Sequence, residues 1–214
     1  MHYPEIFGDV TADPECVNVN VKYNGDKVVR FADVGCGFGG MLIELGRNFP
    51  DVLSVGMEIR DKVSKYVHER ILSLREQYPG DYQNVALIRT NAMKFITNYF
   101  EKGQLEKIFF LFPDPHFKKK KHRRRIITPT LLSEYAYLLQ GGGLVYTITD
   151  VKDLADWMHT HLENHPLFER VADEDLKDDV AANLLFSASE EARKVKRNNG
   201  DMYRNVYRRK AIGL

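Results

Sequence analysis

Short apolar runs alternate with amphipathic segments along most of the chain, and this alternation limits the available folds more than any other feature. Five such pairs follow one another between residues 28 and 162, with no internal repeat and no low-complexity linker. A series of strand-helix units predicts an α/β fold with a doubly wound, mostly parallel sheet. The predicted strands are Val28–Val34, Val52–Met57, Val85–Thr90, Lys107–Phe112 and Leu144–Thr149, with two later strands at Phe168–Val171 and Asn205–Arg209.

Apolar spacing and capping residues predict a helix after each of the first five strands. These helices span residues 41–49, 63–74, 93–100, 128–139 and 150–162, and a short sixth helix is expected at 189–196. Thr128 caps the fourth helix, while Gly141–Gly143 ends it and Asp150 caps the fifth. Residues 1–26 lack clear periodicity and are expected to form an irregular N-terminal arm. The length of 214 residues predicts one domain, residues 1–214.

Composition excludes several classes of protein. With 43% apolar, 29% charged and 11% aromatic residues, the chain can build a core and is neither disordered nor fibrous. The two cysteines, Cys16 and Cys36, form no zinc-binding pattern and favour a reducing, intracellular setting. No apolar stretch approaches the roughly 18 residues of a membrane helix, and the first ten residues lack a signal-peptide pattern. We therefore expect the chain neither to bind a metal ion nor to insert into a membrane.

Charge is strongly segregated although the net charge is only +1. Lys118–Arg125 holds seven Lys/Arg and one His, and Arg193–Lys210 holds eight Lys/Arg with the single acid Asp201. Each segment carries +7, and the rest of the chain, with 16 Lys/Arg against 29 Asp/Glu, carries −13. A basic surface on an acidic body indicates a site for a polyanion such as a nucleic acid.

A glycine-rich loop, DVGCGFGG, joins the first strand to its helix, where doubly wound sheets bind ligands. Gly35, Gly37 and Gly40 also fit the dinucleotide fingerprint, and Glu58 can bind the ribose of a nicotinamide or an adenosyl cofactor. The loop therefore predicts a nucleoside-type ligand without deciding which one. Asp33 favours a cationic ligand over a pyrophosphate, and the chain is short for a dehydrogenase with a separate substrate domain.

The fourth strand ends in FFLFPDPHFKKKKHRRR, which presents a carboxylate, Asp114, just before the basic run. Together with the glycine loop, Met57-Glu58-Ile59-Arg60 and Asn91-Ala92, this motif resembles the tRNA (guanine-N7-)-methyltransferases, most closely their eukaryotic catalytic subunit. The resemblance extends from about Phe31 to Arg209. It implies a class I, Rossmann-like methyltransferase with a seven-stranded sheet, and transfer of a methyl group from S-adenosylmethionine to N7 of a guanosine in tRNA.

The same resemblance assigns roles to residues. It implies Asp114 as the acidic residue of the catalytic site, and Ser189-Glu190-Glu191 as the segment that closes over cofactor and substrate, with Ser where the family usually has Thr. The residues implied to bind the cofactor are Gly35, Gly37, Glu58, Arg60, Asn91, Ala92, Leu111, Ser189, Glu190 and Glu191. The residues predicted to contact RNA are Lys118, Lys119, Lys120, Lys121, His122, Arg123, Arg124 and Arg125.

The resemblance also implies partners and a location. The eukaryotic family members work with a separate, non-catalytic WD-repeat subunit, and a basic run of this kind is also typical of a nuclear-localisation signal. We therefore expect tRNA and a WD-repeat protein as partners and a nuclear location, with the cytoplasm as a second one. Family members carry a longer basic N-terminal stretch, so the chain is expected to be truncated.

Two other functions fit parts of the sequence. A nicotinamide-dependent oxidoreductase is compatible with the glycine loop but not with the Pro-Asp-Pro motif. A non-catalytic RNA-binding subunit with the same fold is compatible with the basic run, but it has no need of Gly35, Glu58 and Asp114 together. The basic run itself is open to three readings: an RNA contact, a solvated charge run or a localisation signal.

Overall fold

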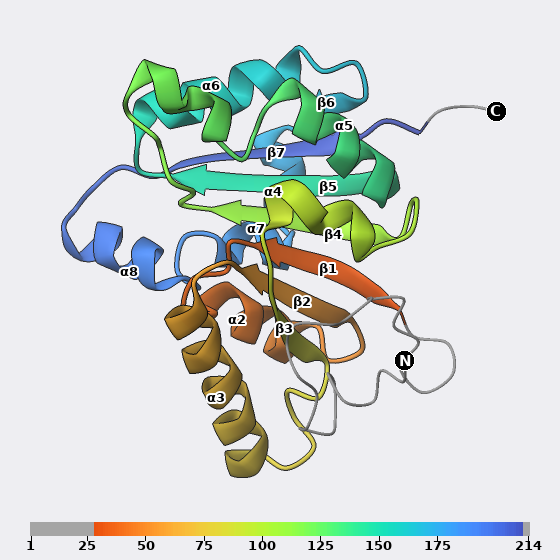
Figure 1. Ribbon diagram of the computed structural model, residues 1–214, viewed down its shortest axis with the longest axis vertical. Helices are drawn as coiled ribbons and strands as arrows, with labels where there is room; N and C mark the ends of the chain where they lie inside the picture. Colours follow the sequence, from red (N-terminus) through yellow and green to blue (C-terminus); the bar gives the residue numbers. More distant parts are fainter. Residues whose placement is uncertain (1–27, 212–214) are drawn as a thin grey trace.

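The structure is a computed structural model, which describes residues 28–211, so the predicted arm at residues 1–26 lies outside the described residues. Its centre is a seven-stranded sheet with the order β3-β2-β1-β4-β5-β7-β6 (Figure 1). The first five strands are parallel, and β7 is antiparallel to both of its neighbours. The strands are β1 (Val29–Val34), β2 (Leu53–Glu58), β3 (Val85–Arg89), β4 (Leu105–Leu111), β5 (Leu139–Thr149), β6 (Phe168–Arg170) and β7 (Tyr203–Arg209). The predicted doubly wound, mostly parallel sheet is confirmed.

Helices cover both faces of the sheet (Figure 1). The helices α4 (Ala92–Phe95), α5 (Pro129–Leu138) and α6 (Lys152–Glu163) pack on one face, together with the 3-10 helix η1 (Ile96–Asn98). The helices α2 (Gly40–Asn48) and α7 (Val180–Leu184) pack on the other, and α3 (Asp61–Gln77) packs against α2 and β3. The last helix, α8 (Glu190–Arg197), lies near the carboxyl ends of the parallel strands in this view.

The central strand β4 is buried on both faces, as the apolar run IFFLF predicts. Ile108 and Phe110 belong to the core under α5 and α6, whereas Phe109 and Leu111 belong to the core under α2 and α7. None of the four is more than 9% exposed. Because β4 joins two hydrophobic cores, the turn after Leu111 starts from one of the most firmly held positions in the molecule.

Several element boundaries differ from the predicted ones. The strand β5 begins at Leu139 rather than Leu144, because the three glycines continue the chain into the sheet instead of ending the helix. Gly142 has φ of 85°, and the pairing of β4 with β5 shifts register at this point. Asp150 does not cap α6, which begins after Val151, whose amide donates to Thr149 Oγ1 at 3.2 Å. The amphipathic pattern at 93–100 forms α4 and η1 instead of one helix.

The segment between β6 and α8 contains two elements that the sequence pattern did not predict. These are the 3-10 helix η3 (Asp173–Leu176) and α7. Asp179 caps α7 by accepting a hydrogen bond from the Ala182 amide at 3.0 Å, and its other oxygen accepts one from Tyr146 Oη at 2.6 Å. This pair of contacts ties the segment to β5 inside the sheet.

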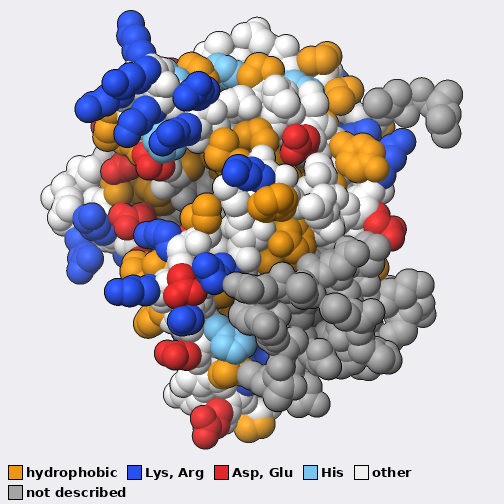
Figure 2. All heavy atoms as spheres, viewed as in Figure 1, with side chains coloured by type: hydrophobic (Ala, Val, Ile, Leu, Met, Phe, Trp, Pro, Cys, Tyr) orange, Lys and Arg blue, Asp and Glu red, His pale blue; other side chains and the backbone are white. Residues whose placement is uncertain are grey.

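The strand order reverses between β1 and β4, and ligands of doubly wound sheets bind at this switch point. Because these strands are parallel, the loops that follow β1, β2, β3 and β4 all leave the same edge of the sheet. The heads of β4 and β5 point to this edge at the left of Figure 1. In the same orientation, Figure 2 shows Lys and Arg side chains gathered at the upper left and along the left edge, with acidic side chains between them. Within the described range, no helix is long and apolar enough to cross a membrane.

Candidate active site

The glycine loop between β1 and α2 folds into a tight turn that glycine makes possible. Gly39 precedes α2 with φ of 79°, and a Cβ atom there would lie 2.9 Å from Val67 Cγ1 of α3. A Cβ atom on Gly40 would lie 2.4 Å from the Ala188 carbonyl oxygen and 2.7 Å from Glu190 Oε2. The loop therefore packs directly against α3 on one side and against the chain that leads into α8 on the other.

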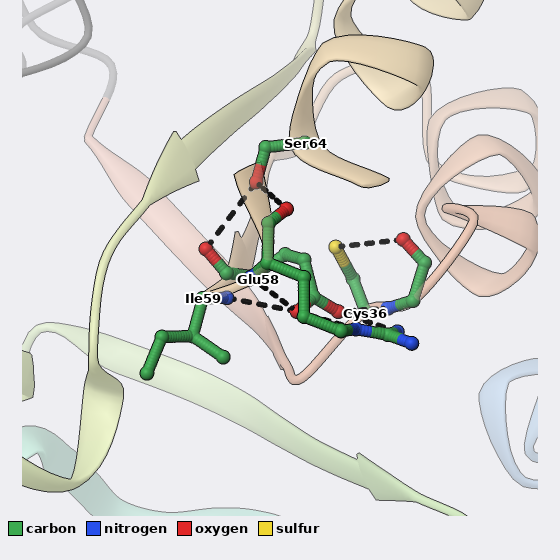
Figure 3. A network of polar contacts seen from close by, with 6 residues as sticks. Cys36, Glu58, Ile59 and Ser64 are labelled. Atoms are coloured by element: carbon green, nitrogen blue, oxygen red, sulfur yellow. Dashed lines mark hydrogen bonds and ion pairs between the residues drawn. The ribbon is translucent and has the colours of Figure 1, made fainter. Parts of the chain in front are cut away.

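Glu58 ends β2 and fastens this loop in place (Figure 3). Its Oε1 accepts hydrogen bonds from the Ile59 and Arg60 amides, both at 2.9 Å, and its Oε2 accepts one from the Gly37 amide at 3.2 Å. The Arg60 guanidinium adds two more bonds, at 3.1 Å each. Burial raises the pKa of Glu58, but these bonds outweigh it and hold the pKa below its ordinary value. Glu58 is thus a fixed anion beside the loop.

Asp33 lies at the end of β1 and is only 1% exposed. Its Oδ2 is one of three buried side-chain polar atoms that have no hydrogen-bond partner among the described residues. Burial, together with the charges of Glu190 and Glu58, raises the pKa of Asp33 to about 7. Since an unpaired buried carboxylate is costly, this site favours a ligand that brings a positive charge or a hydrogen-bond donor.

The N-terminal turn of α8 lies against the glycine loop. Ser189 caps α8, because its Oγ accepts a hydrogen bond from the Ala192 amide at 3.1 Å. The Glu190 carboxylate pairs with Arg70 of α3 at 2.9 Å, and Arg70 also donates to the Phe38 carbonyl of the loop at 2.8 Å. The hydrogen bond to Glu58 is the main cause that raises the pKa of Arg60, and the negative charge of Glu191 adds a smaller contribution. The structure thus brings the predicted closing segment to the loop, and gives the Ser189 hydroxyl a structural role.

The other predicted cofactor residues follow the neighbouring strands. Asn91 comes after β3 and starts α4, where its carbonyl accepts from the Lys94 and Phe95 amides at 3.0 Å each. Ala92 and Leu111 are each 9% exposed, at the start of α4 and the end of β4. All ten residues predicted for the cofactor thus lie on loops or ends at this edge of the sheet or on the segment that covers it.

The Pro-Asp-Pro turn follows β4 and turns Asp114 outward. Phe112 before it and His116 after it both have positive φ, 47° and 45°, which is rare for residues with a side chain. The Asp114 side chain is 71% exposed, and its Oδ1 accepts a hydrogen bond from the His116 amide at 2.9 Å. Strained backbone of this kind is concentrated at functional sites. The turn therefore presents a carboxylate at the same edge as the glycine loop.

The basic run forms a 3-10 helix, η2 (Lys119–Arg124), directly after this turn. Six of its predicted RNA contacts have exposed side chains: Lys118, Lys119, Lys120, Lys121, Arg123 and Arg124. Figure 2 shows a gathering of Lys and Arg side chains at the upper left. His122 is only half-buried, but its ring turns inward and lies 5.2 Å from the ring of Trp157.

The prediction that Arg125 contacts RNA is wrong. Arg125 is only 1% exposed and lies beneath the run instead of on its surface. Its guanidinium pairs with Asp153 at 2.6 Å, donates to the Pro115 carbonyl at 2.8 Å and stacks 4.8 Å from the Trp157 ring. These contacts fasten the turn that carries Asp114 to α6. A run of like charges in the sequence did not reveal that its last member points inward.

The site fits a nucleoside ligand that carries a positive charge. The unpaired Asp33 oxygen favours a cation, and the space beside Gly35 is open, because a Cβ atom there would meet no atom within 4 Å. Among residues 28–211, no group of three or more His, Cys, Asp or Glu side chains could hold a metal ion.

Comparison with known proteins decides the family. A family model described as putative methyltransferase matches residues 27–205. A tRNA (guanine-N(7)-)-methyltransferase of Aedes aegypti is 60% identical over 86% of this chain and 76% of the relative. Proteins of the same name from Caenorhabditis elegans and Arabidopsis thaliana are 58% and 59% identical, over 88% and 86% of this chain and 76% and 73% of the relatives. The chain belongs to this methyltransferase family.

Solved structures confirm the predicted fold class of the methyltransferase. A 16S rRNA methyltransferase matches 86% of this chain and 89% of its own with a TM-score of 0.58 at 16% identity. An S-adenosylmethionine-dependent O-methyltransferase of Thermotoga maritima matches 88% of this chain and 62% of its own with a TM-score of 0.55, also at 16% identity. The predictions of a class I methyltransferase fold and of methyltransferase activity are thus confirmed, and the oxidoreductase alternative is set aside.

Replacing Asp33 is predicted to change how the stability of the methyltransferase depends on pH. The buried carboxyl keeps its proton up to pH about 7, whereas an unfolded Asp loses it near pH 4, so native stability falls as the pH rises between these values. Asp33→Asn removes this penalty. The free energy of unfolding of the variant, relative to that of the wild type, should be on the order of 2 kcal/mol higher at pH 8 than at pH 5. Thermal unfolding at both pH values measures this gain, and an equal difference at both would contradict it.

The corrected role of Arg125 predicts a loss of stability that other members of the basic run do not show. Arg125→Gln removes the bonds to Asp153 and Pro115 and leaves a poorly packed hole beside Trp157. We expect the free energy of unfolding to fall by about 2 kcal/mol. Lys120→Gln, at an exposed position of the same run, is the matched control and should change it by less than about 0.5 kcal/mol. Urea denaturation compares the two, and equal midpoints for all three proteins would contradict the structural role.

Proposed function

We propose that this chain transfers a methyl group from S-adenosylmethionine to N7 of a guanosine in tRNA. The observation that carries the proposal is the place of Asp114, an exposed carboxylate four residues before the basic run. It lies on the turn after β4, the strand next to β1 and its glycine loop. A ligand site, a carboxylate and a cationic surface thus follow one another along one edge of the sheet. The names of the relatives, at 58–60% identity, support the same reaction.

The residues at the edge of the sheet fit S-adenosylmethionine. Its ribose would be held by Glu58, and its positively charged end would lie towards Asp33 and the N-terminal turn of α8. The backbone of Gly35 and Gly37 leaves room for close approach, while Asn91, Ala92 and Leu111 would bound the base. When bound, the cofactor supplies a methyl group on a sulfonium, which is a strong electrophile.

Methylation at N7 requires little from the protein beyond alignment. Guanine N7 carries an in-plane lone pair and no proton, so no strong general base is needed. The work of the side chains is then to position the base and to exclude other geometries. Asp114 can accept hydrogen bonds from the Watson–Crick edge of the guanine, and its negative charge stabilises the positive charge that develops on the ring.

The target guanosine must leave the stacked helix to reach Asp114. In A-form RNA, N7 lies in the deep and narrow groove, beyond the reach of side chains. A flipped base, or a base in a loop, is therefore the substrate that this edge of the sheet can accept. The exposed cations of η2 bind the phosphates next to it, and the exposed Lys194, Lys196 and Arg197 on α8 extend the basic surface.

Two further proposals come from the family likeness and from the basic run. A separate, non-catalytic WD-repeat protein is proposed as the second subunit. The nucleus is proposed as the main location, with the cytoplasm as a second one, because a Lys/Arg-rich octamer can also act in nuclear import. A fluorescent fusion with Lys118–Lys121 replaced by Gln tests the location, and unchanged nuclear accumulation would contradict the role of the run in import.

The reaction is tested with methyl-labelled S-adenosylmethionine and unmodified tRNA, with and without a candidate WD-repeat subunit. Borohydride and aniline then cleave the RNA at N7-methylguanosine. Cleavage at a single guanosine would support N7-methylation as the reaction, tRNA as the substrate and S-adenosylmethionine as the donor. Cleavage that depends on the second protein would support the WD-repeat subunit. Incorporation of label without cleavage would show that the methyl group goes to an atom other than guanine N7. No label in either condition, despite binding of S-adenosylhomocysteine, would favour the RNA-binding subunit that has no catalytic role.

Replacing Asp114 should abolish turnover and spare the cofactor. Asp114→Asn keeps the shape of the exposed side chain but removes the negative charge that faces the base. We expect kcat to fall by a factor of about 100 or more, while the dissociation constant of S-adenosylhomocysteine stays unchanged. Methyl transfer under saturating cofactor and isothermal titration calorimetry measure the two quantities. An equal loss of cofactor affinity would show that Asp114 belongs to the cofactor site instead.

Neutralising the run should weaken RNA binding in a salt-dependent way. Replacing Lys118–Lys121 with Gln removes four exposed cations, so fewer counterions are released when tRNA binds. The slope of log K against log salt concentration should become shallower by roughly 3. Lys102→Gln, at the amino end of β4 and away from the run, is the control and should leave the slope unchanged. An unchanged slope in the fourfold variant would rule out phosphate contacts at this surface.

A further inference from the structure

We infer that Arg70 is a positioning residue, which holds the N-terminal turn of α8 on the glycine loop and so sets the affinity of the chain for its methyl donor. This inference rests on the proposed function, because it names S-adenosylmethionine as the ligand beneath that turn. The sequence offered no signal for it, since Arg70 lies in the middle of α3, 30 residues beyond the glycine loop and 120 residues before Glu190.

Arg70 joins three elements through one nitrogen atom. Its Nη1 donates to Glu190 Oε1 at 2.9 Å and to the Phe38 carbonyl of the glycine loop at 2.8 Å. The two side chains of the pair are 26% and 35% exposed, so solvent screens the pair only in part. The guanidinium therefore connects α3, the loop and α8 at the point where α8 begins.

Beyond the packing of Ala188 against the glycine loop, few side-chain contacts fix α8 in this place. Only Ala192 and Val195 of this eight-residue helix are buried, so hydrophobic contacts contribute little. The other ion pairs of α8, Arg193–Glu190 and Lys194–Glu191, lie within the helix itself. Among the described residues, the Arg70 pair is the one ion pair that joins α8 to another element. A short helix with so few anchors is expected to open locally.

The position of this turn matters for the ligand because it covers the glycine loop at close range. A Cβ atom on Gly40 would clash with the Ala188 carbonyl and the Glu190 carboxylate. Glu190 also acts on the buried Asp33 through its charge. Closed, the turn completes a negatively charged wall around the site of a cationic ligand. Open, it leaves that site to water, so the apparent affinity for the ligand falls with the closed fraction.

This geometry gives Glu190 a different role from the one that the resemblance implied. Its Oε1 is occupied by Arg70, and Arg193 lies 3.7 Å from the same oxygen. Glu190 therefore acts on the cofactor through the closed position of α8. A double variant distinguishes direct contact of Glu190 with the ligand from action through Arg70. If the two residues act as one pair, the effects of their substitutions are not additive.

The test uses the full chain and S-adenosylhomocysteine as the binding probe. Arg70→Met keeps the length of the side chain and removes its donors, and Arg70→Lys restores one donor and the charge. Lys65→Met, an exposed lysine on the same helix, is the matched control. We expect Arg70→Met to raise both the dissociation constant of S-adenosylhomocysteine and the KM for S-adenosylmethionine about fivefold, with kcat unchanged. Arg70→Lys should recover most of this loss, and Lys65→Met should match the wild type.

A double-mutant cycle and hydrogen exchange separate this role from others. Glu190→Gln alone should resemble Arg70→Met, and the double variant should be no weaker than either single one. The amides of residues 188–193 should exchange faster in Arg70→Met than in the wild type, without any ligand present. This second readout remains informative if the proposed function fails, which would appear as a wild type that does not bind S-adenosylhomocysteine.

Three results would overturn the inference. The first is Arg70→Met binding S-adenosylhomocysteine as tightly as the wild type, with unchanged exchange at 188–193. The second is a lower kcat at unchanged KM together with a lower melting temperature, which would make Arg70 a purely structural residue of α3. The third is a double variant much weaker than both single variants, which would show that Glu190 contacts the ligand independently of Arg70.

Discussion

The close approach of two backbone segments determines the geometry of the whole site. The glycine loop and the chain entering α8 lie so near each other that Gly40 has no space for a side chain. This contact joins the first turn of the fold to a segment almost 150 residues later in the sequence. The loop that receives the ligand and the segment that covers it therefore form one unit, which Glu58 fastens from the side of β2 and Arg70 from the side of α3. Substitutions in any of these elements are expected to act on the others.

The position of Asp114, the proposed catalytic carboxylate, depends on a second set of contacts, which begins in the core. The strand β4 is buried between two hydrophobic cores, and the turn after it carries Asp114 into solvent. Arg125 then holds the far side of this turn through the Pro115 carbonyl, with Trp157 and Asp153 of α6 beneath it. An exposed side chain thus gains a fixed direction from buried neighbours, which is what a reaction based on alignment requires.

The sequence predicted the parts of the fold and site that depend on local patterns. Apolar periodicity identified all seven strands and the helices on both faces, and the order of motifs placed Gly35, Glu58 and Asp114 at one edge of the sheet. It did not predict η3 and α7, because Asp179 holds α7 in place through a contact with Tyr146 in a distant strand. For the same reason it misassigned Arg125, which differs from Arg124 only in the direction its side chain takes. Contacts between residues far apart in the sequence, such as Arg70 with Glu190, leave no periodic signal.

The distribution of charge explains how one small surface can serve two ligands of opposite sign. S-adenosylmethionine is a cation, and the residues around its proposed site are acids: the buried Asp33 and Glu58, with Glu190 above them. The RNA is a polyanion, and the cations proposed to bind it lie outside this group, on η2 and on the outer end of α8. The helix α8 carries both signs, with acids at its first turn and bases at its last. A phosphate bound at its basic end would screen the favourable interaction of those cations with the carboxyl end of the helix dipole. Binding of RNA and closure over the cofactor are therefore expected to be coupled, because the same helix takes part in both.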